Sequence, residues 1–372
     1  MIMKKVLFLI TNLAHGGAER VLVNLANNLN KEKFDVTVQT IFDEGVNRQY
    51  LSPNIHYKSV FEKSFHGIKY ITAALPSSIL HKLFIKDSYD YEIAYLEGPP
   101  AKIISGCKNR NTKLLSWIHI ELLNNKSFSE GFRSASEAKK NYRKFHKIIC
   151  VSNTVKKCFE SISGISENVE VLYNTNETEK IRELSKVQVE DLTFNGTLTI
   201  CSVAKIEDSK GYDRLLEAHK RLIDDGYLHR IILIGIGAQM DKLREKAKAY
   251  GVSKSFILIG FRDNPYKYVA NSGLYVCSSR REGFSTAVTE ALIVGTPVIS
   301  TDCSGARELL GDHDEFGIVV ENSTEGIYQG MKRMMEEPGL MDYYRKQAQI
   351  RGMHFSREKT VSAVENMLES IK

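Results

Sequence analysis

The sequence has few cysteines, no long apolar run, no internal repeat and no low-complexity segment. No apolar stretch approaches the ~20 residues that span a bilayer. The six cysteines form no C-x-x-C pair, and most lie in or beside apolar stretches (Cys107, Cys150, Cys158, Cys201, Cys277 and Cys303). We therefore expect structural thiols in a reducing cytoplasm, and we do not expect a zinc site.

The first ten residues, MIMKKVLFLI, imitate a signal peptide. Their apolar stretch is limited to Val6–Ile10, which is too short for the hydrophobic region of a signal sequence. We expect a first buried strand here instead, and hence a cytoplasmic protein.

Basic residues are concentrated in the first half of the chain. Residues 1–178 hold 24 Lys and Arg against 17 Asp and Glu, whereas residues 179–372 hold 27 against 28. The simplest interpretation is a solvated basic face. A sharper one is attraction to an anionic membrane surface or a phosphate-bearing acceptor. Nucleic acid is not expected as a partner, because aromatic residues are not interleaved with the basic ones.

Strand-like apolar runs alternate with helical patterns along all 372 residues, a length that suits two domains. The strand-like runs are 4–10, 34–42, 91–97, 112–119, 146–152, 170–174, 198–204, 231–237, 256–261, 274–279 and 296–302. The alternation predicts an α/β fold with two Rossmann-like, doubly wound domains that face each other across a cleft. We expect an N-terminal domain at 1–178, a linker at 179–193, a C-terminal domain at 194–356 and a final helix at 357–372 that packs back towards the N-terminal domain.

Two glutamates eight residues apart are the most informative feature of the second half. Glu282 falls on the turn between the strand 274–279 and the helix 286–295, and Glu290 lies about one turn inside that helix. The peptide N–H groups between them point out of the helix start and favour an anion (Gly283, Phe284, Ser285 and Thr286). Two carboxylates beside such a site suit a ligand with phosphates and sugar hydroxyls. The alternative is an ordinary strand-to-helix turn with two solvated glutamates.

Other turns at the carboxyl ends of strands carry residues suited to a ligand. Lys205 and Lys210 could neutralise a diphosphate, and Gly235 allows close approach of the backbone. Phe261 could lie beside a nucleobase and is followed by Arg262. The simpler alternatives are surface lysines and an aromatic at the rim of the core.

Together these turns resemble the glycosyltransferases of family 4, which are retaining enzymes of the GT-B fold. The segment EGFSTAVTEALIVGTPVISTD resembles the E-x7-E signature of the family, and SVAKIEDSKGYDRLLEA resembles its phosphate-binding turn. LIGIGAQMDKL, GGAERVLVNLA and SWIHIEL are similar to its glycine-rich turn, its first-domain loop and its histidine segment. The resemblance covers nearly the whole chain and extends to bacterial surface-polysaccharide enzymes.

The resemblance implies a role for each matching residue. Glu290 would accept hydrogen bonds from the ribose hydroxyls, and Lys205 and Lys210 would hold the diphosphate. Glu282 would contact the donor sugar and His119 would lie beside it, so these two are the catalytic candidates. The other donor-binding candidates are Gly16, Gly17, Gly235, Phe261, Arg262, Gly283, Phe284, Ser285 and Thr286. His15 is a weaker candidate, with capping of the loop as its simpler role.

The chain departs from the family pattern at two of these positions. Lys205 stands where arginine is usual, which removes bidentate phosphate binding, and Ser285 stands where glycine is frequent. The one D-x-D match, Asp312-His313-Asp314, is expected to be an exposed turn and not a metal site. Lysines and helix N–H groups can stabilise the leaving group without a metal, so no metal and no cofactor are expected.

The expected activity is retaining transfer of a hexosyl or N-acetylhexosaminyl group from a nucleotide-diphosphate sugar, with uridine as the favoured base. The expected acceptor is a lipid-linked glycan or polysaccharide of the bacterial surface. The segment 65–87 could place the enzyme on the inner face of the membrane, with ordinary core-packing helices as the alternative. A GT-B epimerase or phosphorylase, or a two-lobed sugar-binding protein without catalysis, remains the competing function.

Overall fold

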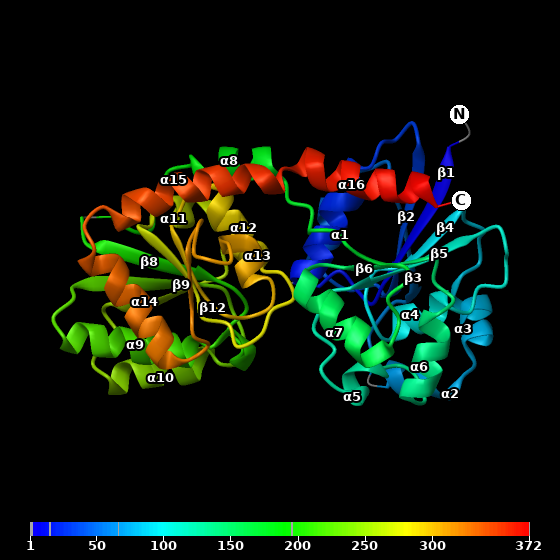
Figure 1. Cartoon of the computed structure of the whole chain (residues 1–372), viewed down its shortest axis with the longest axis horizontal. Coiled ribbons are helices and arrows are strands. Elements are labelled where there is room, and N and C mark those ends of the chain that lie inside the picture. Colours follow the sequence, from blue (N-terminus) through cyan, green and yellow to red (C-terminus); the bar gives the residue numbers. More distant parts are fainter. Residues whose placement is uncertain (1–2, 15, 66, 195, 372) are drawn as a thin grey trace. The chain divides into compact units, whose positions relative to one another are not determined.

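The computed structural model describes residues 3–14, 16–65, 67–194 and 196–371, and the chain divides into two compact units. The first unit comprises Met1–Asn176 and Arg357–Lys372, and the second comprises Glu177–Ser356. Each unit contains one parallel sheet with helices on its two faces (Figure 1). This confirms the predicted α/β fold with two Rossmann-like sheets.

The sheet of the first unit has seven parallel strands in the order β3-β2-β1-β4-β5-β6-β7. The strands are β1 (Lys4–Ile10), β2 (Phe34–Phe42), β3 (His56–Phe61), β4 (Tyr91–Ala94), β5 (Lys113–Ile118), β6 (Lys147–Cys150) and β7 (Val169–Val171). Its helices are α1 (Gly17–Asn28), η1 (Val46–Tyr50), α2 (Ile68–Ala74), α3 (Ser77–Phe84), α4 (Pro99–Ile104), α5 (Asn125–Phe128), α6 (Ala135–Tyr142), α7 (Asn153–Ser163) and α16 (Arg357–Ser370). Residues 6–10 of β1 are fully buried, as expected of a first core strand. The edge strand β3 was not predicted, because its side chains are largely exposed and form no apolar run.

The sheet of the second unit has six parallel strands in the order β10-β9-β8-β11-β12-β13. The strands are β8 (Leu198–Val203), β9 (His229–Ile234), β10 (Phe256–Gly260), β11 (Leu274–Cys277), β12 (Val298–Thr301) and β13 (Ile318–Val320). Its helices are α8 (Thr178–Ser185), η2 (Asp208–Lys210), α9 (Tyr212–Asp224), α10 (Met240–Ala249), α11 (Tyr266–Asn271), α12 (Thr286–Ile293), α13 (Ala306–Leu310), α14 (Thr324–Glu336), α15 (Leu340–Gly352) and η3 (Met353–Phe355).

The core of the second unit lies between the sheet and the helices on one of its faces. Leu215, Leu216 and Leu222 of α9 recur at helical spacing and are fully buried against the strands. Figure 1 shows α9, α10 and α14 on this face and α11, α12 and α15 on the other. The sheet is thus covered on both sides, and its ligand-binding loops are left at the ends of the strands.

The stretch 179–193, expected to be a linker, belongs to the second unit and contains most of α8. Ile181 is buried, and the carbonyl of Leu184 accepts a hydrogen bond of 2.9 Å from Asn264 Nδ2. Further on, Asp191 pairs with Arg262 at 3.0 Å. Ile181 is the one buried apolar residue of this short helix, so the apolar pattern is weak and the stretch resembles a linker in the sequence.

The last helix, α16, leaves the second unit and packs within the first. The Tyr91 hydroxyl of β4 donates a buried hydrogen bond of 2.9 Å to the carbonyl of Leu368. Lys33 pairs with Glu369 at 2.7 Å, and Val364 and Leu368 are buried. The first unit is therefore completed by the carboxyl end of the chain.

Across the described ranges, every helix is too short or too polar to cross a membrane.

Candidate functional site

The order of strands in the second sheet marks where a ligand would bind. The chain passes from β8 to β9 on one side, whereas β11 lies on the other side of β8. The loops after β8 and β11 therefore diverge from the same point of the sheet edge, which is where open α/β sheets bind ligands. Lys205 and Lys210 follow β8, and Glu282 follows β11.

Lys210 and Glu282 form an ion pair at this point. The Lys210 Nζ lies 2.8 Å from Glu282 Oε1, and the two side chains are only 23% and 13% exposed. Ser279 Oγ donates to the same carboxylate at 2.6 Å. Burial lowers the pKa of Lys210, but the charge and hydrogen bond of Glu282 outweigh it and leave the pKa above its usual range. Lys210 is therefore a fully charged ammonium at neutral pH.

Backbone contacts hold the turn that carries Lys210. Ser278 Oγ donates to the carbonyl of Lys210 at 2.8 Å. Gly211 has a φ of +65°, and a Cβ there would lie 2.1 Å from the carbonyl oxygen of Ser278. Only glycine allows the two turns to approach so closely. The ammonium of Lys210 is thus presented on a rigid turn.

Arg280 stabilises the same turn and was not predicted from the sequence. Its guanidinium makes two hydrogen bonds to the Asp213 carboxylate, at 2.8 and 2.7 Å, and a third to the carbonyl of Asp208. The hydrogen bond from Arg280 holds the pKa of Asp213 below its usual range. In the sequence, Arg280 could have been identified by its position two residues before Glu282, on the same turn.

The first turn of α12 lies beside this pair. Ser285 caps the helix, and its side chain accepts from the Val288 N–H at 3.4 Å. The helix begins at Thr286, so the predicted amides of Gly283, Phe284, Ser285 and Thr286 do lie at a helix start. Glu290 Oε1 accepts a hydrogen bond of 3.3 Å from the hydroxyl of Tyr266, a residue that sequence reasoning missed.

The remaining predicted residues of this unit differ in their exposure and in their contacts. Lys205 is exposed at the end of β8, and Phe261 is half-exposed at the end of β10. A Cβ on Gly235 would lie 1.9 Å from the carbonyl oxygen of Ala204, so this glycine is required for packing between two turns. Arg262 is bound to Asp191 and to the Tyr268 hydroxyl, and so also has a structural task.

The D-x-D match lies on a turn outside this group. Asp312 and His313 are exposed, and Asp314 adopts a φ of +60°. Asp314 Oδ1 accepts a hydrogen bond of 2.9 Å from the Val319 N–H, which fixes the turn before β13. The geometry agrees with the predicted turn.

In the first unit the corresponding point of the sheet lies between β1 and β4. Gly16 precedes α1 at the end of the loop after β1, and Gly17 is the first residue of that helix. His15 lies outside the described residues. The loop after β4 carries Glu97, and His119 follows the neighbouring strand β5.

Glu97 and His119 are in direct contact. Glu97 Oε2 accepts a hydrogen bond of 3.1 Å from the His119 N–H, and the imidazole stands 4.9 Å from the ring of Tyr95. Burial lowers the pKa of His119 to about 3 and raises the pKa of Glu97 to about 7. The imidazole is thus neutral, and its buried Nε2 has no hydrogen-bond partner among the residues that the structure describes.

Glu97 was missed by sequence reasoning. The signal was its place in YLEG, directly after a buried strand. A buried polar nitrogen without a partner is uncommon and marks His119 as a position where a ligand can bind.

Two family models together match most of the chain. One, described as Glycosyltransferase Family 4, matches residues 15–180, and the other, described as Glycosyl transferases group 1, matches residues 185–351.

Curated proteins with related sequences match over most of their length. The chain is 27% identical over 373 residues to the N-acetylgalactosamine-N,N'-diacetylbacillosaminyl-diphospho-undecaprenol 4-alpha-N-acetylgalactosaminyltransferase of Campylobacter jejuni, covering 96% of this chain and 97% of that protein. It is 22% identical over 336 residues to the amylovoran biosynthesis glycosyltransferase AmsD of Erwinia amylovora, covering 88% of each.

Solved structures share the fold at lower identity. Anabaena Alr3699/HepE in complex with UDP-glucose is similar with a TM-score of 0.78 and 19% identity, covering 99% of this chain and 100% of that chain. Staphylococcus aureus TarM is similar with a TM-score of 0.75 and 15% identity, covering 99% of each.

Proposed function

The chain belongs to glycosyltransferase family 4, and from that premise we propose that it moves a hexosyl or N-acetylhexosaminyl group from a UDP-sugar to a glycan acceptor, with retention at the anomeric carbon. It has the GT-B fold and is a glycosyltransferase. The donor, the stereochemical course and the acceptor are the parts that we propose.

The ion pair of Lys210 and Glu282 carries this proposal. Departure of a nucleoside diphosphate places negative charge on the leaving phosphate, and a mostly buried ammonium at a strand end can stabilise it. When the diphosphate takes Lys210 as its partner, the Glu282 carboxylate becomes available to the hydroxyls of the donor sugar. The first-turn amides of α12 add the positive end of a helix.

Other residues complete the donor site in this proposal. Glu290 binds the ribose hydroxyls, with Tyr266 orienting its carboxylate. Lys205 is a second ammonium for the diphosphate. As the resemblance implies, His119 lies beside the donor sugar, and Gly16 and Gly17 contribute to donor binding. A neutral His119 can exchange hydrogen bonds with sugar hydroxyls without adding charge.

Transfer in this proposal needs no metal, because the lysines and the helix amides supply the positive charge. The leaving phosphate accepts the proton of the acceptor hydroxyl on the same face of the sugar, so the acceptor oxygen bonds to the anomeric carbon as the bond to phosphate breaks. No side chain has to act as a nucleophile.

The relatives support the choice of donor and acceptor. The Campylobacter relative is named for transfer of N-acetylgalactosamine to a diphospho-undecaprenol glycan, and the Anabaena structure contains UDP-glucose. UDP-N-acetylgalactosamine and UDP-glucose are therefore the first donors to test, with an undecaprenyl-diphosphate sugar as acceptor.

The outer surface of α2 and α3 supports a position at an anionic membrane. Tyr70 of α2 is 71% exposed, and Ile79 and Leu83 of α3 are about half-exposed. Leu80 and Phe84 of the same helix are buried. Exposed Lys82 and Lys86 lie among the apolar side chains, which is the pattern of a helix that rests on an anionic surface. We propose peripheral association with the inner face of the cell membrane.

The donor site is tested with purified protein, a panel of nucleotide sugars and the lipid-linked acceptor. We expect one UDP-sugar to give a product that retains its anomeric configuration by NMR. Lys210→Ala should lower kcat by about 10²–10³, because it removes a donor to the leaving phosphate. Glu290→Ala should raise KM for the donor. Lys254→Ala is the matched control, since this exposed lysine precedes β10 at the opposite edge of the same sheet.

The alternatives give different products. An epimerase would convert the nucleotide sugar without acceptor, a phosphorylase would require a glycan and inorganic phosphate, and a sugar-binding protein would give no product. Full activity of folded Lys210→Ala and Glu290→Ala would show that the donor site is placed wrongly.

A further inference from the structure

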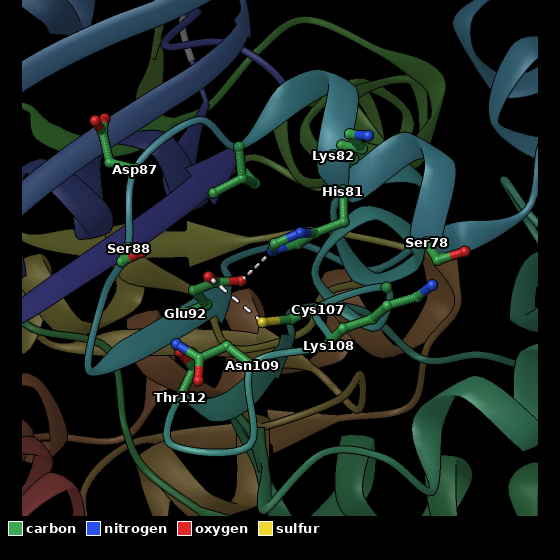
Figure 2. A pocket seen from close by; sticks show the side chains of 12 residues that line it. Ser78, His81, Lys82, Asp87, Ser88, Glu92, Cys107, Lys108, Asn109 and Thr112 are labelled. Atoms are coloured by element: carbon green, nitrogen blue, oxygen red, sulfur yellow. Dashed lines mark hydrogen bonds and ion pairs between the residues drawn. The ribbon is translucent and has the colours of Figure 1, made fainter.

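Three side chains capable of binding a metal converge in a cavity of the first unit. His81 comes from α3, Glu92 from β4 and Cys107 from the segment after α4. The ligand atoms of the three residues all lie within 4.8 Å of one another. Figure 2 shows the His81 imidazole above the Glu92 carboxylate and the Cys107 sulfur below it, both directed toward it, and the three side chains line a cavity of about 330 Å³.

The distances within this His-Glu-Cys cluster are close to those of a metal site. The His81 Nε2 lies 2.7 Å from Glu92 Oε2, and the Cys107 Sγ lies 3.7 Å from Glu92 Oε1. A tetrahedral Zn²⁺ with bonds of about 2.0–2.3 Å separates its ligand atoms by about 3.3–3.6 Å. The imidazole and the carboxylate would move apart by about half an ångström. The sulfur would have to approach the other ligand atoms, because the two printed contacts are to different oxygens of Glu92 and the ligand atoms lie up to 4.8 Å apart.

The donor set selects a particular class of cation. A nitrogen, a carboxylate oxygen and a thiolate sulfur are the three ligand types that Zn²⁺ uses, whereas Mg²⁺ and Ca²⁺ require oxygen ligands. One carboxylate and one thiolate also cancel the charge of Zn²⁺, so the occupied cluster is neutral. A neutral site avoids the free-energy cost of a buried net charge, because Glu92 is almost fully buried. It also adds no positive charge to a cavity that Lys82 and Lys108 line.

We propose that His81, Glu92 and Cys107 bind one Zn²⁺ ion, with a water molecule from the cavity as the fourth ligand. On binding, the proton between the imidazole and the carboxylate and the proton of the thiol leave to solvent. The competing interpretation is a metal-free cluster in which His81 and Cys107 only donate hydrogen bonds to a buried carboxylate.

The site is remote from the residues assigned to transfer. Glu92 is the second residue of β4, whereas Glu97, which accepts a hydrogen bond from the His119 N–H, follows the carboxyl end of the same strand. Zinc would therefore tie α3 and the segment after α4 to the sheet, and would act on the stability of the first unit. This inference does not depend on the proposed donor or acceptor.

The test uses the full chain, freed of metal by a chelator and titrated with Zn²⁺ against a chromogenic competitor. We expect one Zn²⁺ per chain and a rise in the unfolding temperature. Co²⁺ in place of Zn²⁺ should give the sulfur-to-cobalt charge-transfer absorption of a thiolate ligand. Cys107→Ser should abolish that absorption and weaken Zn²⁺ binding by at least about 100-fold.

Matched variants separate a metal site from a hydrogen-bond cluster. Cys158→Ser should behave as the wild type, because Cys158 is a partly exposed free thiol of α7 in the same unit. His81→Gln can still donate a hydrogen bond to Glu92 but lacks the imidazole, and it should lose zinc while it stays folded. Zinc that does not bind, or that binds equally to the wild type and the Cys107→Ser or His81→Gln variant, would overturn the proposal.

Activity in a chelator distinguishes this site from the proposed transfer mechanism. If transfer needs no metal, Cys107→Ser should be equally active with and without EDTA, because it has no zinc to lose. Sensitivity of this variant to EDTA would contradict metal-independent transfer and leave the zinc site unaffected.

Discussion

The Lys210 ammonium and the Glu282 carboxylate are 2.8 Å apart and mostly shielded from water. Pairs of this kind add little net stability, because desolvation of the two charges offsets their attraction. Ser279 and the Arg280–Asp213 pair nevertheless hold both partners in place. The ordered pair is consistent with the proposed function, in which a bound diphosphate separates the two charges.

Glu97 and His119 have pKa values shifted in opposite directions by the same cause. Burial disfavours the charged form of each, so near neutral pH the imidazole is neutral and the carboxyl group is partly protonated. Burying two such groups lowers the stability of the folded chain, and groups with pKa values shifted in this way are concentrated at functional sites. Their place at the carboxyl ends of β4 and β5 is consistent with use in binding.

Substitution of Glu97 by Gln should make the first unit more stable at high pH. Folding raises the pKa of Glu97 from 4.5 to about 7, so the wild type is stabilised below about pH 4.5 and loses that stability as the pH rises to about 7. The glutamine side chain does not ionise, so the variant does not lose this stability as the pH rises. We expect a stability gain of the order of 1–3 kcal/mol at about pH 8 relative to about pH 5. Urea unfolding followed by Trp117, the only tryptophan, measures it in this unit.

Glu62→Gln is the control, because this glutamate of the same unit is exposed. The substitution should have little effect on stability. A pH-independent effect of Glu97→Gln would show that the carboxyl group is ionised normally in the folded chain.

Helix α3 of the first unit carries apolar side chains on its outer face as well as on its buried face. In α3 the inner side chains Leu80 and Phe84 are buried, while Ile79 and Leu83 lie four residues apart on the exposed side. A solvated helix would carry polar residues there. The apolar outer face with neighbouring lysines supports contact with lipid.

Leu83→Glu should weaken binding to vesicles that contain anionic lipid by about tenfold or more. The change removes a side chain whose transfer to an apolar phase contributes about 1.5–3 kcal/mol, and it adds a charge repelled by the surface. Co-sedimentation at low and high salt provides the measurement. Leu228→Glu, on an exposed leucine of the second unit, should bind as the wild type. Equal binding of both variants, or no salt-sensitive binding at all, would exclude this face.

At the scale of the molecule, the first unit is not a continuous segment of the chain. The second unit lies within the first in sequence, because α16 returns to pack beside β4 and the end of α1. The stability of the first unit therefore depends on residues far beyond its other elements.

Leu368→Ala should destabilise the first unit by about 2–5 kcal/mol, because it removes a fully buried side chain and leaves a cavity. Urea unfolding monitored by Trp117 reports this unit. Asn366→Ala changes an exposed residue of the same helix and should have little effect. If the two variants unfold alike, α16 does not contribute to the core of the first unit.

The extent of prediction from sequence differs between parts of the fold. Buried strands such as β1 have a strong local apolar pattern, and these were predicted. The edge strand β3 and the helix α8 were missed, because an exposed strand and a helix with few buried positions leave little apolar pattern.

The sequence by itself determined the two Rossmann-like sheets and the turn that carries Glu282, since periodicity and helix-start chemistry act over a few residues. Only the tertiary structure decided which turns meet. The order of strands places β11 beside β8, and so joins Glu282 to Lys210 across 72 residues. In the same way it joins Glu97 to His119, whereas the packing of α3 and of the segment after α4 against the sheet brings His81 and Cys107 to Glu92. Such contacts depend on which strands are neighbours in the sheet, and spacing along the chain does not record this.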